Sequence, residues 1–171
     1  MHFGVEAAPS PSILEPNSHV RLGVSLEKFA FSLFATNYEG SHTARVIFPT
    51  EFNLLYRNGG LRVDYNAPFK NALFKDKLLS RIYIQAALGD VVWNVQENGE
   101  DRFREVVWNV QPGIELNYQV LDLLRVSLSM GWRLHSGLDM PSLRASDFSG
   151  AIITFGVAVG VFRKLKVSDD K

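Results

Sequence analysis

The sequence predicts an all-β protein, an antiparallel, up-and-down membrane β-barrel of about eight strands. Three observations support this fold class. Apolar and polar residues alternate over long stretches, and clusters of Gly, Asn, Asp and Ser separate these stretches. A period of two residues is that of a β-strand, whose side chains point alternately to opposite faces of a sheet. No apolar run approaches the ~20 residues that a membrane-spanning helix needs.

The clearest alternation covers residues 106–135. Apolar residues occupy the even-numbered positions of both halves, and polar residues or Gly occupy nearly all of the odd-numbered ones. A tight reversal at Asp122 joins the halves, as the turn of an antiparallel hairpin would. The apolar face supplies the residues that we expect to contact lipid: Val106, Trp108, Val110, Ile114, Leu116, Tyr118, Val126, Leu128, Met130 and Trp132.

Weaker alternation extends the barrel on both sides of this hairpin. Candidate strands cover residues 20–27, 29–37, 42–57, 60–67, 81–88 and 148–162. Three prolines, Pro9, Pro11 and Pro16, favour an extended or mobile arm over residues 1–18. We therefore place the barrel at residues 19–163 and a charged tail at residues 164–171.

Alternation alone does not separate a membrane barrel from a soluble β-barrel or β-sandwich, which is the alternative fold. The spacing of aromatic residues favours the membrane. Trp108 and Tyr118 lie ten residues apart on one face. At ~3.3 Å per residue and a ~40° tilt they span roughly 25 Å, the height of the apolar band of a membrane barrel between its two aromatic girdles.

The polar faces carry Arg and acidic residues, whereas the lysines lie at expected strand ends, in loops or in the tail. Arg binds carboxylates through paired hydrogen bonds, and an interior of about eight strands is just wide enough to be filled by side chains. We therefore predict a lumen filled by ion pairs and without a pore, in which Glu115 pairs with Arg125 or Arg133. The residues assigned to the lumen are Arg81, Glu105, Glu115, Arg125 and Arg133, and further charged candidates are Arg21, Glu27, Arg45, Glu51, Arg57, Arg62 and Asp64.

Residues 61–162 resemble the C-terminal barrel segment of the outer-membrane assembly-factor, or bacterial surface-antigen, superfamily. The resemblance rests on the stretch 60–69, which ends in Ala67-Pro68-Phe69, on Gly89-Asp90 ahead of an aromatic residue, and on a terminal signal. This insertion signal comprises Thr154, Gly156, Val159 and Val161. The resemblance implies a barrel in the outer membrane of a Gram-negative bacterium, recognised by the insertion machinery. The superfamily's Val-Arg-Gly-aromatic loop motif is missing, so the resemblance does not imply its transport activity.

The sequence predicts no catalytic, metal or cofactor site. The chain has no Cys, and its four His residues lack metal-ligand spacing. Basic and acidic residues balance at 18 each, so no global positive field would attract nucleic acid. His135, Ser136 and Glu115 are the residue types of a hydrolase, but neighbouring strand residues point to opposite faces.

Three function classes follow from these observations. The first is an outer-membrane barrel with a structural, anchoring or assembly role, whose partners are membrane lipid, the insertion machinery and other subunits of an assembly. The second is an outer-membrane lipid-modifying hydrolase, and the third is a soluble β-barrel that binds a small apolar ligand. An outer-membrane protein must be exported, and no secretory signal is recognisable near Met1. We therefore expect a mature protein or a piece of a longer one.

Overall fold

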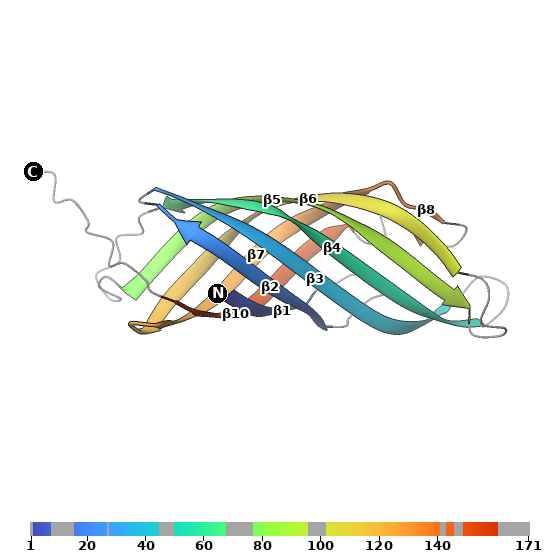
Figure 1. Ribbon diagram of the computed structural model, residues 1–171, viewed down its shortest axis with the longest axis horizontal. Coiled ribbons are helices and arrows are strands. Elements are labelled where there is room, and N and C mark those ends of the chain that lie inside the picture. The colour runs from blue at the N-terminus through green and yellow to red at the C-terminus, as the bar shows by residue number, and fades with distance from the viewer. Residues whose placement is uncertain are drawn as a thin grey trace, which may run out of the picture.

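The computed structural model describes residues 2–7, 16–26, 28–44, 50–67, 77–95, 102–140, 143–145 and 149–160. Eight antiparallel strands close into a barrel in the order β1-β10-β7-β6-β5-β4-β3-β2 (Figure 1). The remaining two strands form a short hairpin between β7 and β10. The strands are β1 (His2–Ala7), β2 (Pro16–Ser25), β3 (Phe29–Ala44), β4 (Thr50–Ala67), β5 (Leu78–Val95), β6 (Arg102–Leu121), β7 (Leu124–Ser136), β8 (Asp139–Met140), β9 (Leu143–Arg144) and β10 (Gly150–Val159).

Apart from the closure at β1, each barrel strand pairs with its neighbours in the sequence, which is the up-and-down arrangement. The predicted fold class is therefore confirmed. The hairpin of β6 and β7 turns at Asp122, as the sequence predicted, and its register places Leu116 opposite Leu128 and Glu115 opposite Ser129. One register shift occurs between Gln119 and Leu121, next to the turn.

The N-terminal arm is a correction to the sequence-based prediction. Residues 2–7 form β1, which pairs with both β2 and β10, so that Gly4 lies opposite His19 and Gly156. The barrel thus begins at His2, not at residue 19. The strand was missed because its six residues are too few to show a period, and because closure pairs it with the far end of the sequence. Residues 8–15 and the predicted tail at 164–171 lie outside the described residues.

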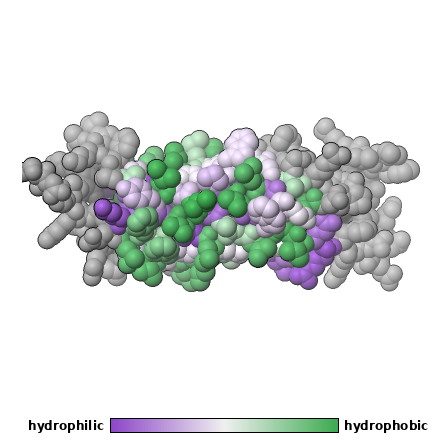
Figure 2. Space-filling view, turned by 90° about the horizontal axis from the view of Figure 1, so that it is seen from above, coloured by the Kyte–Doolittle hydropathy of each residue, from purple (hydrophilic) through white to green (hydrophobic). Residues whose placement is uncertain are grey.

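The polarity of the barrel is inverted relative to a soluble protein. Its interior holds buried charged side chains, among them Arg62, Asp64 and Glu115, and its outer wall exposes large apolar ones, such as Leu61 and Ile82. Figure 2 shows hydrophobic side chains over much of the middle of the surface that it presents. Soluble monomers rarely expose apolar patches of this extent. In the part of the chain that the structure describes, no helix is long and apolar enough to cross a membrane.

Candidate functional site

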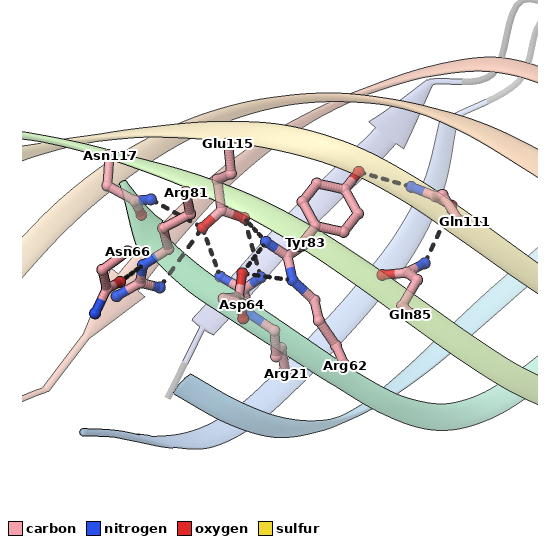
Figure 3. A network of polar contacts seen from close by, with 10 residues as sticks. All are labelled: Arg21, Arg62, Asp64, Asn66, Arg81, Tyr83, Gln85, Gln111, Glu115 and Asn117. Atoms are coloured by element: carbon pink, nitrogen blue, oxygen red, sulfur yellow. Dashed lines mark hydrogen bonds and ion pairs between the residues drawn. The ribbon is translucent and has the colours of Figure 1, made fainter. Parts of the chain in front are cut away.

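The interior of the barrel is organised around the carboxylate of Glu115, on β6. This side chain is 2% exposed and accepts hydrogen bonds from Arg21 at both of its oxygen atoms, at 3.0 and 3.2 Å. Arg62, on β4, donates a further hydrogen bond to Glu115 Oε2 at 2.7 Å (Figure 3). Since β2, β4 and β6 are not adjacent in the barrel, these bonds connect its walls across the lumen.

Two more side chains complete the surroundings of Glu115. Arg81 Nη1 lies 3.7 Å from Glu115 Oε1, and Asn117 donates a hydrogen bond to the same oxygen at 2.9 Å. Arg62 also binds Asp64 through its Nε and Nη2 atoms, at 2.9 and 2.6 Å. A buried carboxylate that is paired and hydrogen-bonded in this way offsets much of the cost of its desolvation.

A second layer, in which Arg133 meets amide and hydroxyl side chains, continues this network along the barrel axis. Arg133 and Gln85 both donate to Gln111 Oε1, at 2.9 and 3.0 Å, and Gln111 donates to the hydroxyl of Tyr83 at 2.9 Å. The Arg62 guanidinium lies 3.7 Å from the centre of the Tyr83 ring, which is a cation–π distance. Tyr83 therefore links the charged layer to the amide layer.

The ring of Tyr83 occupies space that two glycines leave open. A β-carbon built on Gly113 would collide with the Tyr83 ring, and one on Gly131 would lie 2.6 Å from the Tyr83 hydroxyl oxygen. These two glycines face each other across β6 and β7. The absence of their side chains leaves room for the aromatic ring of Tyr83 against the inner wall.

The described lumen is filled beside the Glu115 network. The cavity between the charged layer and the amide layer has a volume of about 10 Å³, which is at the lower limit for a single water molecule. Its walls are His19, Phe34, Thr36, Arg62, Tyr83, Gln85, Gln111, Ser129 and Thr154.

A second interior cluster surrounds the hydroxyl of Tyr56. Asn109 donates to it at 3.0 Å, Asn58 donates to it as well, and His135 Nε2 lies 2.8 Å from it. In the β6–β7 register His135 lies opposite Asn109, whereas Glu115 lies six residues further along β6, which is ~20 Å at ~3.3 Å per residue. The structure thus does not bring His135 and Glu115 together as a hydrolase would require.

Solved structures of similar shape were found, whereas no protein-family model and no curated protein matches the chain. The N-terminal β-barrel domain of Pseudomonas aeruginosa OprF has a TM-score of 0.54 at 12% identity, over 92% of this chain and 93% of that one. Neisserial surface protein A (NspA) has a TM-score of 0.55 at 10% identity, over 92% and 91%. Both are eight-stranded barrels of bacterial outer membranes. The chain has the fold of an outer-membrane β-barrel.

The outer wall of this outer-membrane barrel fold carries the residues that the sequence placed on the lipid side. Nine of the ten are exposed, including Trp108 at 50% and Leu128 at 38%, and Val110 is partly exposed. The wall also exposes apolar residues of the weaker strands, which the sequence assigned less completely: Val20, Leu22, Val24, Phe29, Phe31, Leu33, Leu61, Val63, Tyr65, Ile82, Ile84, Leu88, Phe155, Val157 and Val159.

The five residues assigned to the lumen lie at different depths. Arg81, Glu115 and Arg133 are buried, whereas Glu105 and Arg125 are partly exposed. The predicted partners of Glu115 are wrong. It lies opposite Ser129, so Arg125 and Arg133 are each four residues away along β7, or ~13 Å.

The actual partners, Arg21 and Arg62, come from strands with weaker alternation, and they were among the further charged candidates. Arg57 was another of these candidates, and its assignment to the lumen is wrong because it is exposed on the outer wall. Leu61, Val63 and Tyr65 show that the odd-numbered positions of this strand are the apolar ones. Extending that alternation towards the N-terminus would have placed Arg57 on the outer wall. Nothing is described for the side chains of Glu27, Arg45 and Glu51.

The predicted insertion signal lies on β10, the strand that pairs with β1 to close the barrel. Thr154 and Gly156 are buried, and Val159 is exposed. Val161 lies outside the described residues.

The first prediction concerns the charge on Glu115. Glu115→Gln leaves Arg21, Arg62 and Arg81 beside a neutral group, and removing one partner of a buried ion pair costs about 3–5 kcal/mol. We expect the folded barrel to unfold at lower urea concentration in detergent, measured by its mobility on a gel.

Two double variants test which arginine is coupled to Glu115. Arg21 makes its side-chain bonds to Glu115, so Arg21→Met should restore part of the stability that Glu115→Gln loses. Arg125→Met, the matched control, should restore none. Equal rescue by both would contradict the ion-pair geometry.

The second prediction concerns the glycine beside Tyr83. Gly113→Val inserts a side chain where the Tyr83 ring and the backbone oxygen of Met130 lie, and overpacking of this kind costs about 1–3 kcal/mol or more. Gly59→Val is the control, because a β-carbon at Gly59 would make an ordinary contact of 3.4 Å with Phe34 O. The urea midpoint should fall for Gly113→Val alone; an equal fall for both would show that any β-branched residue is disfavoured in these strands.

Proposed function

We propose that this chain is a structural barrel of the bacterial outer membrane, which anchors or displays its connecting segments or serves as a component of a larger membrane assembly. The observation that carries the proposal is the combination of an apolar outer wall with a polar lumen that side chains fill. A bilayer solvates the wall, and closure of the barrel leaves no unpaired strand edge in the hydrocarbon.

Aromatic side chains support a membrane location. Trp108 and Tyr118 lie toward opposite ends of β6, and Trp132 lies on β7 away from the Asp122 turn. Phe29 and Tyr65 form a ring pair with centroids 5.5 Å apart on neighbouring strands. Aromatic rings at both ends of the apolar band are typical of membrane barrels, where they lie at the level of the lipid headgroups.

The lengths of the connections support one orientation. At one end of the barrel the β6–β7 turn spans residues 122–123 and the β2–β3 connection spans residues 26–28, although the β4–β5 connection there spans residues 68–77. The longest connection, between β7 and β10, lies at the other end, spans residues 137–149 and contains the β8–β9 hairpin. Membrane barrels have short periplasmic turns and longer extracellular loops. We therefore place the Asp122 turn in the periplasm and the β8–β9 hairpin outside the cell.

We also propose that the closing strand, β10, guides assembly of the barrel. Thr154, Gly156 and Val159 lie on its closing strand, which supports recognition of this strand, together with Val161, by the outer-membrane insertion machinery. Membership of the assembly-factor superfamily stays a proposal that rests on residues 61–162.

The two alternative functions receive less support. A lipid hydrolase would need an acidic partner for His135, and Glu115 is committed to three arginines. A barrel that binds a small apolar ligand would need an apolar interior, whereas this interior is polar and filled. We infer that the chain has a structural and not a catalytic role.

The third prediction distinguishes the two faces of β7. Leu128→Arg places a charge on the outer wall at mid-strand and should cost about 2–4 kcal/mol in a bilayer. Ser129→Thr keeps the polar character of the adjacent inward position, and its cost should be smaller. Refolding into lipid vesicles at increasing urea concentration measures both, and equal tolerance would argue that the outer wall does not contact lipid.

The fourth prediction concerns permeation. The purified wild-type barrel should show no steady conductance in a planar bilayer, because side chains close the lumen. Glu115→Gln, which loosens the charged layer, should produce transient openings at most. Steady ion-selective currents from the wild type would replace the filled-lumen proposal with a pore.

A further inference from the structure

The outer wall is not uniformly convex. A shallow, wide-open groove of about 650 Å³ crosses strands β2 to β5. Its floor and sides follow one row of register partners, in which Val20 lies opposite Ala35, Ala35 opposite Gly59, and Gly59 opposite Leu88. The central residues of this row, Ala35 and Gly59, are small, whereas Val20 and Leu88 at its ends are large. The wall is therefore hollowed along β3 and β4.

The glycine at the floor of the groove is not imposed by the backbone. A β-carbon on Gly60 would collide with Ala86 O, and one on Gly89 would collide with Arg57 O, so these two glycines are required by the close approach of neighbouring strands. Gly59 has no such neighbour and no positive φ angle. Since glycine weakens a strand, the hollow at Gly59 costs stability without helping the barrel to close.

One side of the groove is polar and cationic. In the next row of register partners Asn37 lies opposite Arg57, and Arg57 opposite Asp90. Asp90 forms an ion pair with Arg104 at 3.2 Å. Arg57 is exposed and forms no ion pair or hydrogen bond with the residues that the structure describes, so this rim carries one uncompensated positive charge.

Beyond the groove, on the side away from Arg57, the outer wall is apolar. The row beyond Gly59 contains Leu22, Leu33 and Leu61, which are 52%, 63% and 64% exposed. Along the strands, therefore, a cation, a shallow trough and an aliphatic surface follow one another. A phosphate-bearing lipid has the complementary order of groups: an anionic phosphate that would face the cation, followed by a hydrocarbon chain that would face the aliphatic surface.

We propose that this groove is a binding site for a phosphate-bearing lipid of the outer leaflet, of which lipid A is the representative. Its phosphate binds Arg57, and an acyl chain lies over Ala35 and Gly59 toward Leu33 and Leu61. The proposal rests on the proposed membrane location and orientation, because the Arg57 rim lies toward the end of the barrel with the β8–β9 hairpin.

The test uses the barrel purified without lipid in a zwitterionic detergent and titrated with lipid A, with bound lipid counted by native mass spectrometry. Arg57→Gln should weaken binding roughly fivefold, which corresponds to about 1 kcal/mol for one cation at a membrane surface. Gly59→Leu fills the trough and should weaken binding by at least as much. Asp90→Asn removes the acidic neighbour and should strengthen binding.

The matched control is Ala151→Leu, which adds the same bulk to the outer wall at an exposed position on β10, opposite Trp132 and outside the groove. It should bind lipid A as the wild type does. Gel mobility before and after heating checks that each variant is folded, and Arg57→Gln, at an exposed position, tests the site even if Gly59→Leu fails to fold.

Several results would overturn the proposal. They are equal lipid A binding by wild type and Arg57→Gln, inorganic phosphate binding that Arg57→Gln weakens and Gly59→Leu leaves unchanged, or a dimer in detergent that Gly59→Leu dissociates. The first excludes the site, the second assigns it to a free anion, and the third to a second copy of the chain. If instead the protein folded and stayed soluble without detergent, the proposed membrane location itself would fail.

Discussion

The carboxylate of Glu115 is the group on which the interior depends. It holds guanidinium groups from β2 and β4 and lies near a third from β5, and in the described lumen the buried arginines outnumber the buried carboxylates. Without this negative charge, three like charges would share a narrow space of low dielectric constant. Because its partners come from strands that are separated in the barrel, the charge also fixes how opposite walls approach each other.

The remaining interior packs outward from this centre. Arg62 stacks on Tyr83, Tyr83 lies over two glycines, and its hydroxyl accepts a hydrogen bond from Gln111. These polar groups thus meet another polar group or a π face, so contacts between side chains stabilise the centre of the lumen without bulk water. A lumen of this kind stabilises the barrel but leaves little room for a permeant ion or a substrate, so function is expected at the wall or in the connecting segments.

The outer wall obeys a different constraint. Contact with lipid requires apolar side chains but no unique packing between them. The outer wall therefore accepts changes in side-chain size that the packed interior does not. In the row from Val20 to Leu88 the small residues Ala35 and Gly59 form the groove. Arg57 lies beside this groove, on the outward face of β4. A charged residue is costly there unless a headgroup, water or an opposite charge solvates it; Asp90 is paired with Arg104, whereas Arg57 has no such partner among the described residues.

The sequence by itself determined β2, β5, β6, β7 and β10, in approximate bounds, and the two faces of the β6–β7 hairpin. It could do so because alternation is a local property, and residues such as Leu128 and Ser129 show it within one strand. The segments that it predicted at 29–37, 42–57 and 60–67 divide the chain wrongly, because β3 continues to Ala44 and β4 runs without a break from Thr50 to Ala67. The tertiary structure decided the closure by β1, the partners of Glu115 and the hollow beside Arg57. These depend on register and curvature, which bring Arg21 to Glu115 over a separation of 94 residues, and no period within a single strand encodes a contact across the lumen.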